Sequence, residues 1–142
     1  MYQRKQLQEL KKRVYEPRKF IQTIVGPRQV GKTTLVKQLV NEIDIPYIYL
    51  SADGISNTNN TWLEQEWEAA RIKLKNSEAQ SLLLIVDEVQ KITNWSNTVK
   101  LLWDADSFND LNLKVVLLGS SRLILEKGLT ESLAGRFEIM YI

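Results

Sequence analysis

Hydrophobic runs with the spacing of strands and of helices alternate along the whole chain. Five short runs predict strands, at residues 20–25, 46–50, 82–86, 115–118 and 137–142. Between these runs, apolar residues recur three and four positions apart, which indicates helices with one buried face. Strands that alternate with helices predict βαβ units and therefore an α/β fold, a three-layer sandwich around a mostly parallel five-stranded sheet.

Local signals place the start of one helix and a break in another. Thr61 and Glu64 form a capping box, which predicts the start of the helix before the third strand. A last helical stretch covers residues 122–133, and Gly128 is expected to interrupt it. We expect the tryptophans at helical spacing to pack helices against the sheet rather than to stack on bases. They are Trp62, Trp67, Trp95 and Trp103.

Composition restricts the kinds of site that the chain can hold. The 142 residues are 44% hydrophobic and 25% charged, as in one ordinary globular domain. Because the sequence has no cysteine and no histidine, it excludes zinc sites built on these residues, thiol nucleophiles and Ser-His-Asp triads. The metal that remains is a hard cation such as Mg²⁺, held by oxygen atoms. No apolar run is long enough to cross a bilayer and the start has no secretory pattern, so we expect a cytoplasmic protein without a membrane partner.

The first 19 residues carry an excess of positive charge. They hold seven lysines and arginines against two glutamates, whereas the whole chain has a net charge of only +2. Leu7, Leu10 and Val14 have the spacing of one helix face, which predicts that residues 1–19 form a helical arm packed on the body of the protein. The basic residues indicate either a solvated helix face or a contact with nucleic acid or an acidic partner.

A phosphate-binding loop follows the first predicted strand. The segment GPRQVGKT matches the pattern G-x-x-x-x-G-K-[ST] between a strand and an amphipathic helix, which is the context that phosphate binding requires. Gly26 and Gly31 let backbone N–H groups point at an anion, and the helix start adds partial positive charge. Lys32 is expected on the β- and γ-phosphates, and Thr33 on Mg²⁺. The expected nucleotide-binding residues of this loop are Gly26, Pro27, Arg28, Gln29, Val30, Gly31, Lys32 and Thr33.

Two carboxylates end the most hydrophobic predicted strand. Asp87 and Glu88 follow residues 82–86, and a carboxylate at the carboxyl end of a buried parallel strand lies beside the ligand crevice. Asp87 is expected to hold Mg²⁺, and Glu88 to act as the general base on an attacking water. An ATPase needs such a second acid, whereas a small-molecule kinase activates a substrate hydroxyl. The chain has no N-K-x-D segment for guanine recognition, so ATP is favoured over GTP.

Two further residues are catalytic candidates, each with a structural alternative. Ser120 follows the fourth predicted strand, where it would either sense the γ-phosphate and hold the water or cap the helix that begins at Arg122. Arg136 precedes the fifth predicted strand, where its guanidinium would either neutralise charge in the transition state, as an arginine finger, or form a structural ion pair. The residues alone leave both alternatives open.

Together, the segments GPRQVGKTTL, LLLIVDEVQKITNW, LLGSS and SLAGR resemble those of the bacterial and archaeal AAA-type ATPases of the P-loop superfamily, over residues 20–142. The resemblance implies the sheet order of the additional-strand ATPases, in which the strand that ends at Asp87 does not neighbour the first strand. It implies the roles given above to the loop and the two carboxylates, and it adds Thr34, which would touch the α-phosphate. Ser120 and Arg136 match a polar strand-tip residue and an arginine of that family.

The resemblance also implies how the chain is organised and what it does. AAA-type proteins carry a helical lid after the core, and relatives with these segments usually continue into a C-terminal domain. We therefore expect a helical arm at residues 1–19 and an ATPase core at residues 20–142. We expect this core to stop before the helical lid and before the C-terminal domain. The predicted function is ATP binding with Mg²⁺-dependent hydrolysis, with Arg136 completing the site of a neighbour in a homo-oligomer. The alternatives are an ATP- or ADP-gated interaction module with little turnover, and an ATPase associated with nucleic acid.

Overall fold

The computed structural model describes residues 2–27, 31–53 and 59–142. Its helices are α1 (Tyr2–Tyr15), α2 (Lys32–Glu42), α3 (Asn60–Lys75), α4 (Trp95–Phe108) and α5 (Arg122–Ser132). Its strands are β1 (Ile21–Val25), β2 (Tyr47–Ser51), β3 (Leu82–Asp87), β4 (Leu113–Gly119) and β5 (Phe137–Tyr141). A turn of 3-10 helix, η1 (Val89–Lys91), follows β3. The strands fall where the hydrophobic runs predict them, which confirms the alternation of strands and helices.

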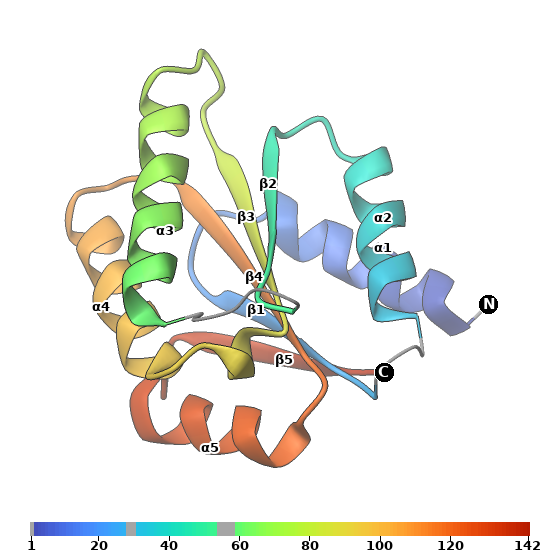
Figure 1. Cartoon of the computed structure of the whole chain (residues 1–142). Coiled ribbons are helices and arrows are strands. Elements are labelled where there is room, and N and C mark those ends of the chain that lie inside the picture. Colours follow the sequence, from blue (N-terminus) through green and yellow to red (C-terminus); the bar gives the residue numbers. More distant parts are fainter. Residues whose placement is uncertain (1, 28–30, 54–58) are drawn as a thin grey trace.

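The described strands form a five-stranded parallel sheet in the order β2-β3-β4-β1-β5. Because β4 lies between β1 and β3, the strand that ends at Asp87 does not neighbour β1, as the resemblance implied. All strands run in the same direction, so their carboxyl ends meet at one edge of the sheet (Figure 1). The segments that follow β1, β3 and β4 therefore lie close together at this carboxyl edge.

Helices cover both faces of the sheet, which confirms the predicted three layers (Figure 1). On one face, α3, α4 and α5 bury a core that includes Trp67, Trp103 and Leu129. On the other face, α1 and α2 bury a core that includes Leu10 and Leu35. The four tryptophans all lie in the first core or pack against it, as predicted. Within the described ranges, no helix combines the length and the apolar character needed to cross a bilayer.

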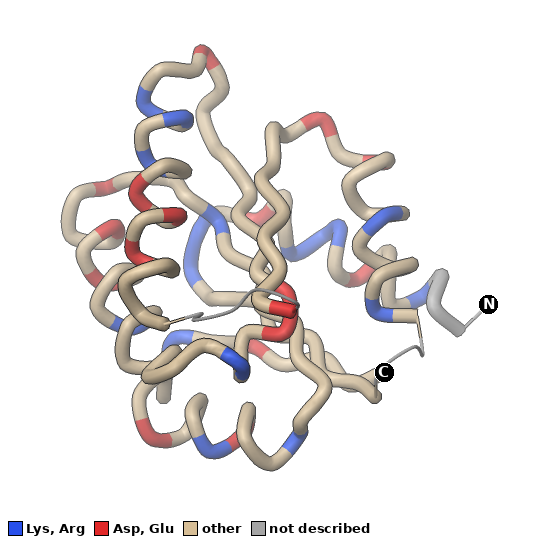
Figure 2. Tube along the Cα trace, viewed as in Figure 1, with Lys and Arg blue, Asp and Glu red and all other residues tan. Residues whose placement is uncertain are grey.

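Helix α1 packs on the body of the protein through the predicted apolar stripe. Leu7, Leu10 and Val14 are at most 4% exposed. On its polar side, Lys11 lies 3.5 Å from Glu42 at the end of α2, and Figure 2 shows further lysines and arginines along the helix. The helix is therefore anchored by burial, and one of its basic residues, Arg13, also contacts the sheet through Gln22 and Glu138.

The capping box predicted at Thr61 and Glu64 is wrong. Helix α3 begins at Asn60, and Asn59 is its N-cap. The side-chain oxygen of Asn59 accepts a hydrogen bond from the backbone N–H of Trp62 at 3.0 Å. Asparagine caps a helix at least as well as threonine does, and the extended backbone of Asn59 places Thr61 inside the first turn.

The break predicted at Gly128 is also wrong. Helix α5 runs from Arg122 to Ser132 without interruption, and Gly128 is buried in it. A Cβ atom at this position would lie 2.4 Å from Cζ2 of Trp95. Glycine is therefore required by the close packing of α5 on α4 rather than by a change in backbone direction.

Candidate functional site

A cavity of about 300 Å³ opens at the carboxyl edge of the sheet. Its lining comes from three segments that are distant in the sequence: the start of α2, the residue pair that ends β3 and the segment after β2. The lining residues are Gly31, Lys32, Thr33, Thr34, Asp53, Asp87 and Glu88. The fold thus brings the predicted phosphate loop and the two predicted carboxylates to one place. The predicted loop residues that lie outside the described ranges are Arg28, Gln29 and Val30.

The ammonium group of Lys32 contacts the residues that directly follow β1. Gly31 has a φ of 96°, a left-handed conformation that favours glycine, and α2 begins at the next residue. Lys32 is only 6% exposed. Its Nζ donates hydrogen bonds to the carbonyl oxygens of Gly26 at 2.9 Å and of Pro27 at 3.4 Å. Two backbone carbonyl groups of the loop therefore bind this buried cation.

The end of β3 places both carboxylates at the same cavity as that lysine. Asp87 is 9% exposed and Glu88 is 5% exposed. Oε1 of Glu88 lies 3.7 Å from Nζ of Lys32, so the two sequence motifs meet as an ion pair. Glu88 has a φ of 54°, which is uncommon for a residue with a side chain and costs on the order of 1–3 kcal/mol. This strained turn directs the chain from β3 into η1.

Asp87 is held from two sides by hydrogen bonds. Its Oδ1 accepts one from the backbone N–H of Glu88 at 2.8 Å, and its Oδ2 accepts one from the hydroxyl of Tyr49 at 2.5 Å. Burial and the hydrogen bond to Asp87 raise the pKa of Tyr49 above its ordinary value. The tyrosine hydroxyl therefore remains a donor at neutral pH and fixes the direction of the carboxylate.

Ser120 faces the carboxylate of Glu88 instead of capping α5. Its Oγ donates a hydrogen bond to Oε2 of Glu88 at 2.9 Å. The N-cap of α5 is Ser121, whose Oγ accepts a hydrogen bond from the backbone N–H of Ile124 at 3.4 Å. Ser121, and not Ser120, therefore caps α5. The catalytic role of Ser120 stays a prediction.

Arg136 lies at the opposite edge of the sheet, because it precedes the first residue of β5. Its Nε and a terminal nitrogen donate to the two carboxylate oxygens of Asp104 at 2.7 and 2.9 Å. These bonds hold the pKa of Asp104 below its ordinary value and raise the pKa of Arg136. The arginine cannot reach the cavity of its own chain from this edge. A role as a finger in the site of a neighbouring copy stays a prediction.

The oxygen atoms at the cavity suit a magnesium ion bound together with phosphate. The hydroxyl of Thr33 and the carboxylate of Asp87 both belong to residues that line it. Within residues 2–27, 31–53 and 59–142, no group of three or more Asp, Glu, His or Cys side chains is placed to hold a metal. Mg²⁺ is usually bound by one or two carboxylates plus substrate phosphates, so this donor set fits a cation that arrives with a nucleotide.

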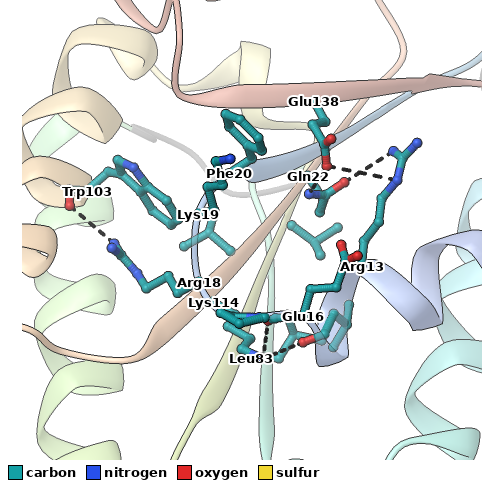
Figure 3. A pocket seen from close by; sticks show the side chains of 14 residues that line it. Arg13, Glu16, Arg18, Lys19, Phe20, Gln22, Leu83, Trp103, Lys114 and Glu138 are labelled. Carbon is teal, nitrogen blue, oxygen red and sulfur yellow. Dashed lines mark hydrogen bonds and ion pairs between the residues drawn. The ribbon is translucent and has the colours of Figure 1, made fainter.

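A second cavity, of about 380 Å³, lies at the amino edge of the sheet (Figure 3). Its basic side chains already bind protein groups. Nε of Arg18 donates to the carbonyl oxygen of Leu113 at 2.7 Å, and its guanidinium stacks 3.5 Å from the ring centre of Trp103. Nζ of Lys114 donates to the carbonyl oxygen of Glu16 at 2.9 Å, and burial lowers the pKa of Lys114. These cations fasten the segment between α1 and β1 to the sheet.

A family model described as an AAA domain matches residues 18–142. The chain belongs to the AAA domain family. The match includes every residue that lines the cavity at the carboxyl edge, so the phosphate loop and the β3 carboxylates are parts of the AAA domain. Helix α1 lies before the matched region. No protein with a curated description matches the chain.

Among solved structures, the AAA domain is similar to a DNA polymerase III gamma subunit-related protein from Thermotoga maritima. The TM-score is 0.64 and the sequence identity is 12%. The match covers 96% of this chain and 45% of the other, so this chain spans less than half the length of that protein. At this identity the similarity shows the fold, and it confirms the α/β class.

Three polar residues at the site of the AAA domain were not predicted: Tyr49, Asp53 and Gln90. Asp53 lines the cavity and forms an ion pair with Lys91 at 2.5 Å. Both Tyr49 and Asp53 come to Asp87 because β2 pairs with β3, and the sequence does not state which strands pair. Gln90 could have been predicted as part of the site, because it lies only two positions after the predicted general base Glu88.

Proposed function

We propose that this AAA domain binds ATP with Mg²⁺ and hydrolyses it to ADP and phosphate. The observation that carries the proposal is the cavity at the carboxyl edge, which is lined by Lys32, Thr33, Asp87 and Glu88. A cation, a hydroxyl, a metal-binding carboxylate and a second carboxylate are the groups that phosphoryl transfer to water requires.

Binding would exchange one set of contacts of Lys32 for another. The β- and γ-phosphates would replace the carbonyl oxygens of Gly26 and Pro27, which Lys32 contacts in this structure. The amide groups at the start of α2 would donate to the phosphates, with Thr34 on the α-phosphate side. Thr33 and Asp87 would hold Mg²⁺, which supplies positive charge to the β- and γ-phosphate oxygens when it is bound.

The reaction would use Glu88 as the general base. A water molecule attacks the γ-phosphorus, its oxygen forms the new P–O bond, and the bond to the bridging oxygen of ADP breaks. One proton of the water passes to Glu88, whose carboxylate Ser120 holds by a hydrogen bond at 2.9 Å. Lys32 stabilises the charge on the transferred phosphoryl group.

Arg136 would act on a neighbouring copy rather than on its own site. It lies at the edge of the sheet away from the cavity, and its side chain is 30% exposed beside Asp104. An arginine supplied by a neighbour is a known way to stabilise the charge of phosphoryl transfer. Turnover per molecule is then expected to rise with protein concentration.

Phosphate release from Mg·ATP tests the proposal directly. We expect steady release by the unchanged protein and a loss of about 100-fold or more in Glu88→Gln, which keeps the shape but cannot take the proton. Nucleotide affinity should stay near that of the unchanged protein. The matched control is Glu138→Gln, because Glu138 is also an acid paired with a basic residue but lies on β5 outside the cavity, and it should keep the full rate.

Two results would contradict the proposal. Equal rates in Glu88→Gln and the unchanged protein would remove Glu88 as the base. Tight ATP binding without phosphate release at any protein concentration would contradict hydrolysis, and it would favour an ATP- or ADP-gated interaction module.

A further inference from the structure

A closed set of hydrogen bonds joins η1 to the tips of β3 and β4. Nε2 of Gln90 donates to Oε2 of Glu88 at 3.0 Å and to Oγ of Ser120 at 3.3 Å. The hydroxyl of Ser120 donates to the same Oε2 at 2.9 Å. The side-chain nitrogen of Gln90 thus donates both to Glu88 and to Ser120, and the hydroxyl of Ser120 donates to Glu88.

This arrangement distinguishes the two oxygens of Glu88. Oε2 accepts from two donors, Gln90 and Ser120, and so faces β4. Oε1 faces Lys32, whose Nζ is 3.7 Å away at the place expected for the phosphates. A carboxylate only accepts hydrogen bonds when ionised, so the amide of Gln90 must point its nitrogen, and not its oxygen, at Glu88.

Keeping Gln90 in this position leaves its other amide atom unsatisfied. Oε1 of Gln90 is buried and has no hydrogen-bond partner among the described residues. It also lies against Gly119, where a Cβ atom would be only 2.6 Å from it. A buried polar atom without a partner lowers stability. The position of the Gln90 side chain therefore lowers the stability of the fold. It lies beside Gly119, where a larger residue would collide with it.

We propose that Gln90 is a positioning residue that holds Glu88 with Oε1 directed at the attacking water. This inference rests on the proposed hydrolysis of ATP. It gives Gln90, two positions after the general base, the task of orienting that base. Gln90 does not line the cavity and would act through the carboxylate of Glu88. Its loss should therefore lower the rate of the chemical step and leave substrate binding unchanged.

The test compares kcat, KM for Mg·ATP and the thermal midpoint of Gln90→Met with those of the unchanged protein. Methionine has a similar length and no donor. We expect kcat to fall about tenfold or more, as for the loss of a hydrogen bond to a charged group, and KM to change by less than about twofold. The thermal midpoint should change little, because the loss of the hydrogen bond to Glu88 and the removal of the unsatisfied oxygen have opposite effects on stability.

Two further variants keep the test independent of folding. Gln90→Glu has the same size but brings a second carboxylate to Glu88, and it should also lose kcat. Gln22→Met is the control. Gln22 lies on β1, and its Nε2 also donates to a carboxylate, that of Glu138 on β5, at 2.8 Å (Figure 3 labels both residues). That variant should keep kcat and lose stability.

The outcomes separate this inference from the proposed function. Phosphate release by the unchanged protein with the same kcat in Gln90→Met would overturn the role of Gln90 alone. A lower thermal midpoint in Gln90→Met, with kcat lowered and KM raised by similar factors, would mean that Gln90 only stabilises the fold. That result would also overturn the role of Gln90. The absence of any release by the unchanged protein would instead contradict the proposed hydrolysis, and this inference with it.

Discussion

Lys32 connects the two motifs of the site. Its ammonium group is bound by the carbonyl of Gly26 at 2.9 Å and faces Glu88 at 3.7 Å. A buried cation of this kind needs partners, and the loop and the carboxylate supply them. A phosphate group that enters the cavity therefore competes with contacts already present, and it would release Glu88 from the lysine.

The pair formed by Arg136 and Asp104 gives a prediction on pH dependence. The hydrogen bond from Arg136 holds the pKa of Asp104 below its ordinary value of 3.8. The pair therefore contributes stability above the pKa of the unfolded state, and loses it as the pH falls through the lower folded value. Because the Asp104 side chain is 43% exposed, we expect Arg136→Gln to cost no more than about 1 kcal/mol at pH 7.

Urea unfolding of the unchanged protein and Arg136→Gln between pH 7 and pH 3 measures this contribution. The difference in the free energy of unfolding should begin to shrink as the pH falls below the ordinary pKa of an aspartate, and it should keep shrinking toward the acid end of the series. A difference that stays constant over the whole range would mean that Arg136 stabilises the protein by packing and not by its charge.

Single residues of the site differ in how far the sequence predicts them. Lys32 and Asp87 stand in motifs whose chemistry requires those residue types at that spacing. Tyr49 and Asp53 belong to no motif, and they reach Asp87 only because their strand pairs with β3. The positive φ of Glu88 has no sequence signal either, because non-glycine residues seldom adopt it.

At the scale of elements, α5 gives a second prediction on stability. Gly128 is buried against Trp95 of α4, and an added methyl group would lie 2.4 Å from the ring. Alanine favours a helix by about 1 kcal/mol over glycine, but overpacking a core typically costs about 1–3 kcal/mol. We expect Gly128→Ala to lower the thermal midpoint. Lys127→Ala, at an exposed position on the same helix, is the control and should change it little.

A higher midpoint in Gly128→Ala would show that the two helices can move apart at no cost. The same position explains why the sequence predicted a break in α5. Glycine within a helical pattern is usually a local backbone signal, whereas here it reflects contact with a residue 33 positions earlier in the chain. The start of α3 was misplaced for a different reason, since asparagine and threonine both cap helices.

For the whole molecule, the hydrophobic pattern was sufficient to predict the class of fold. The apolar run of β3 identified a strand covered on both faces, and the stripe on α1 predicted that the first helix packs on the body. That β3 does not neighbour β1 was implied by the resemblance and not by the pattern, and the structure gives the full order β2-β3-β4-β1-β5. That order is what places the ends of β1, β3 and β4 together, and with them the whole candidate site.

The most direct test of this account is calorimetric titration of Mg·ATP into the unchanged protein and into Lys32→Ala. We expect saturable binding by the unchanged protein, much weaker binding when Mg²⁺ is left out, and no measurable binding by Lys32→Ala. Circular dichroism of both proteins would show that the variant keeps the fold. The absence of heat from the unchanged protein at millimolar Mg·ATP, or equal binding by Lys32→Ala, would contradict the claim that the phosphate loop and the β3 carboxylates form a nucleotide site.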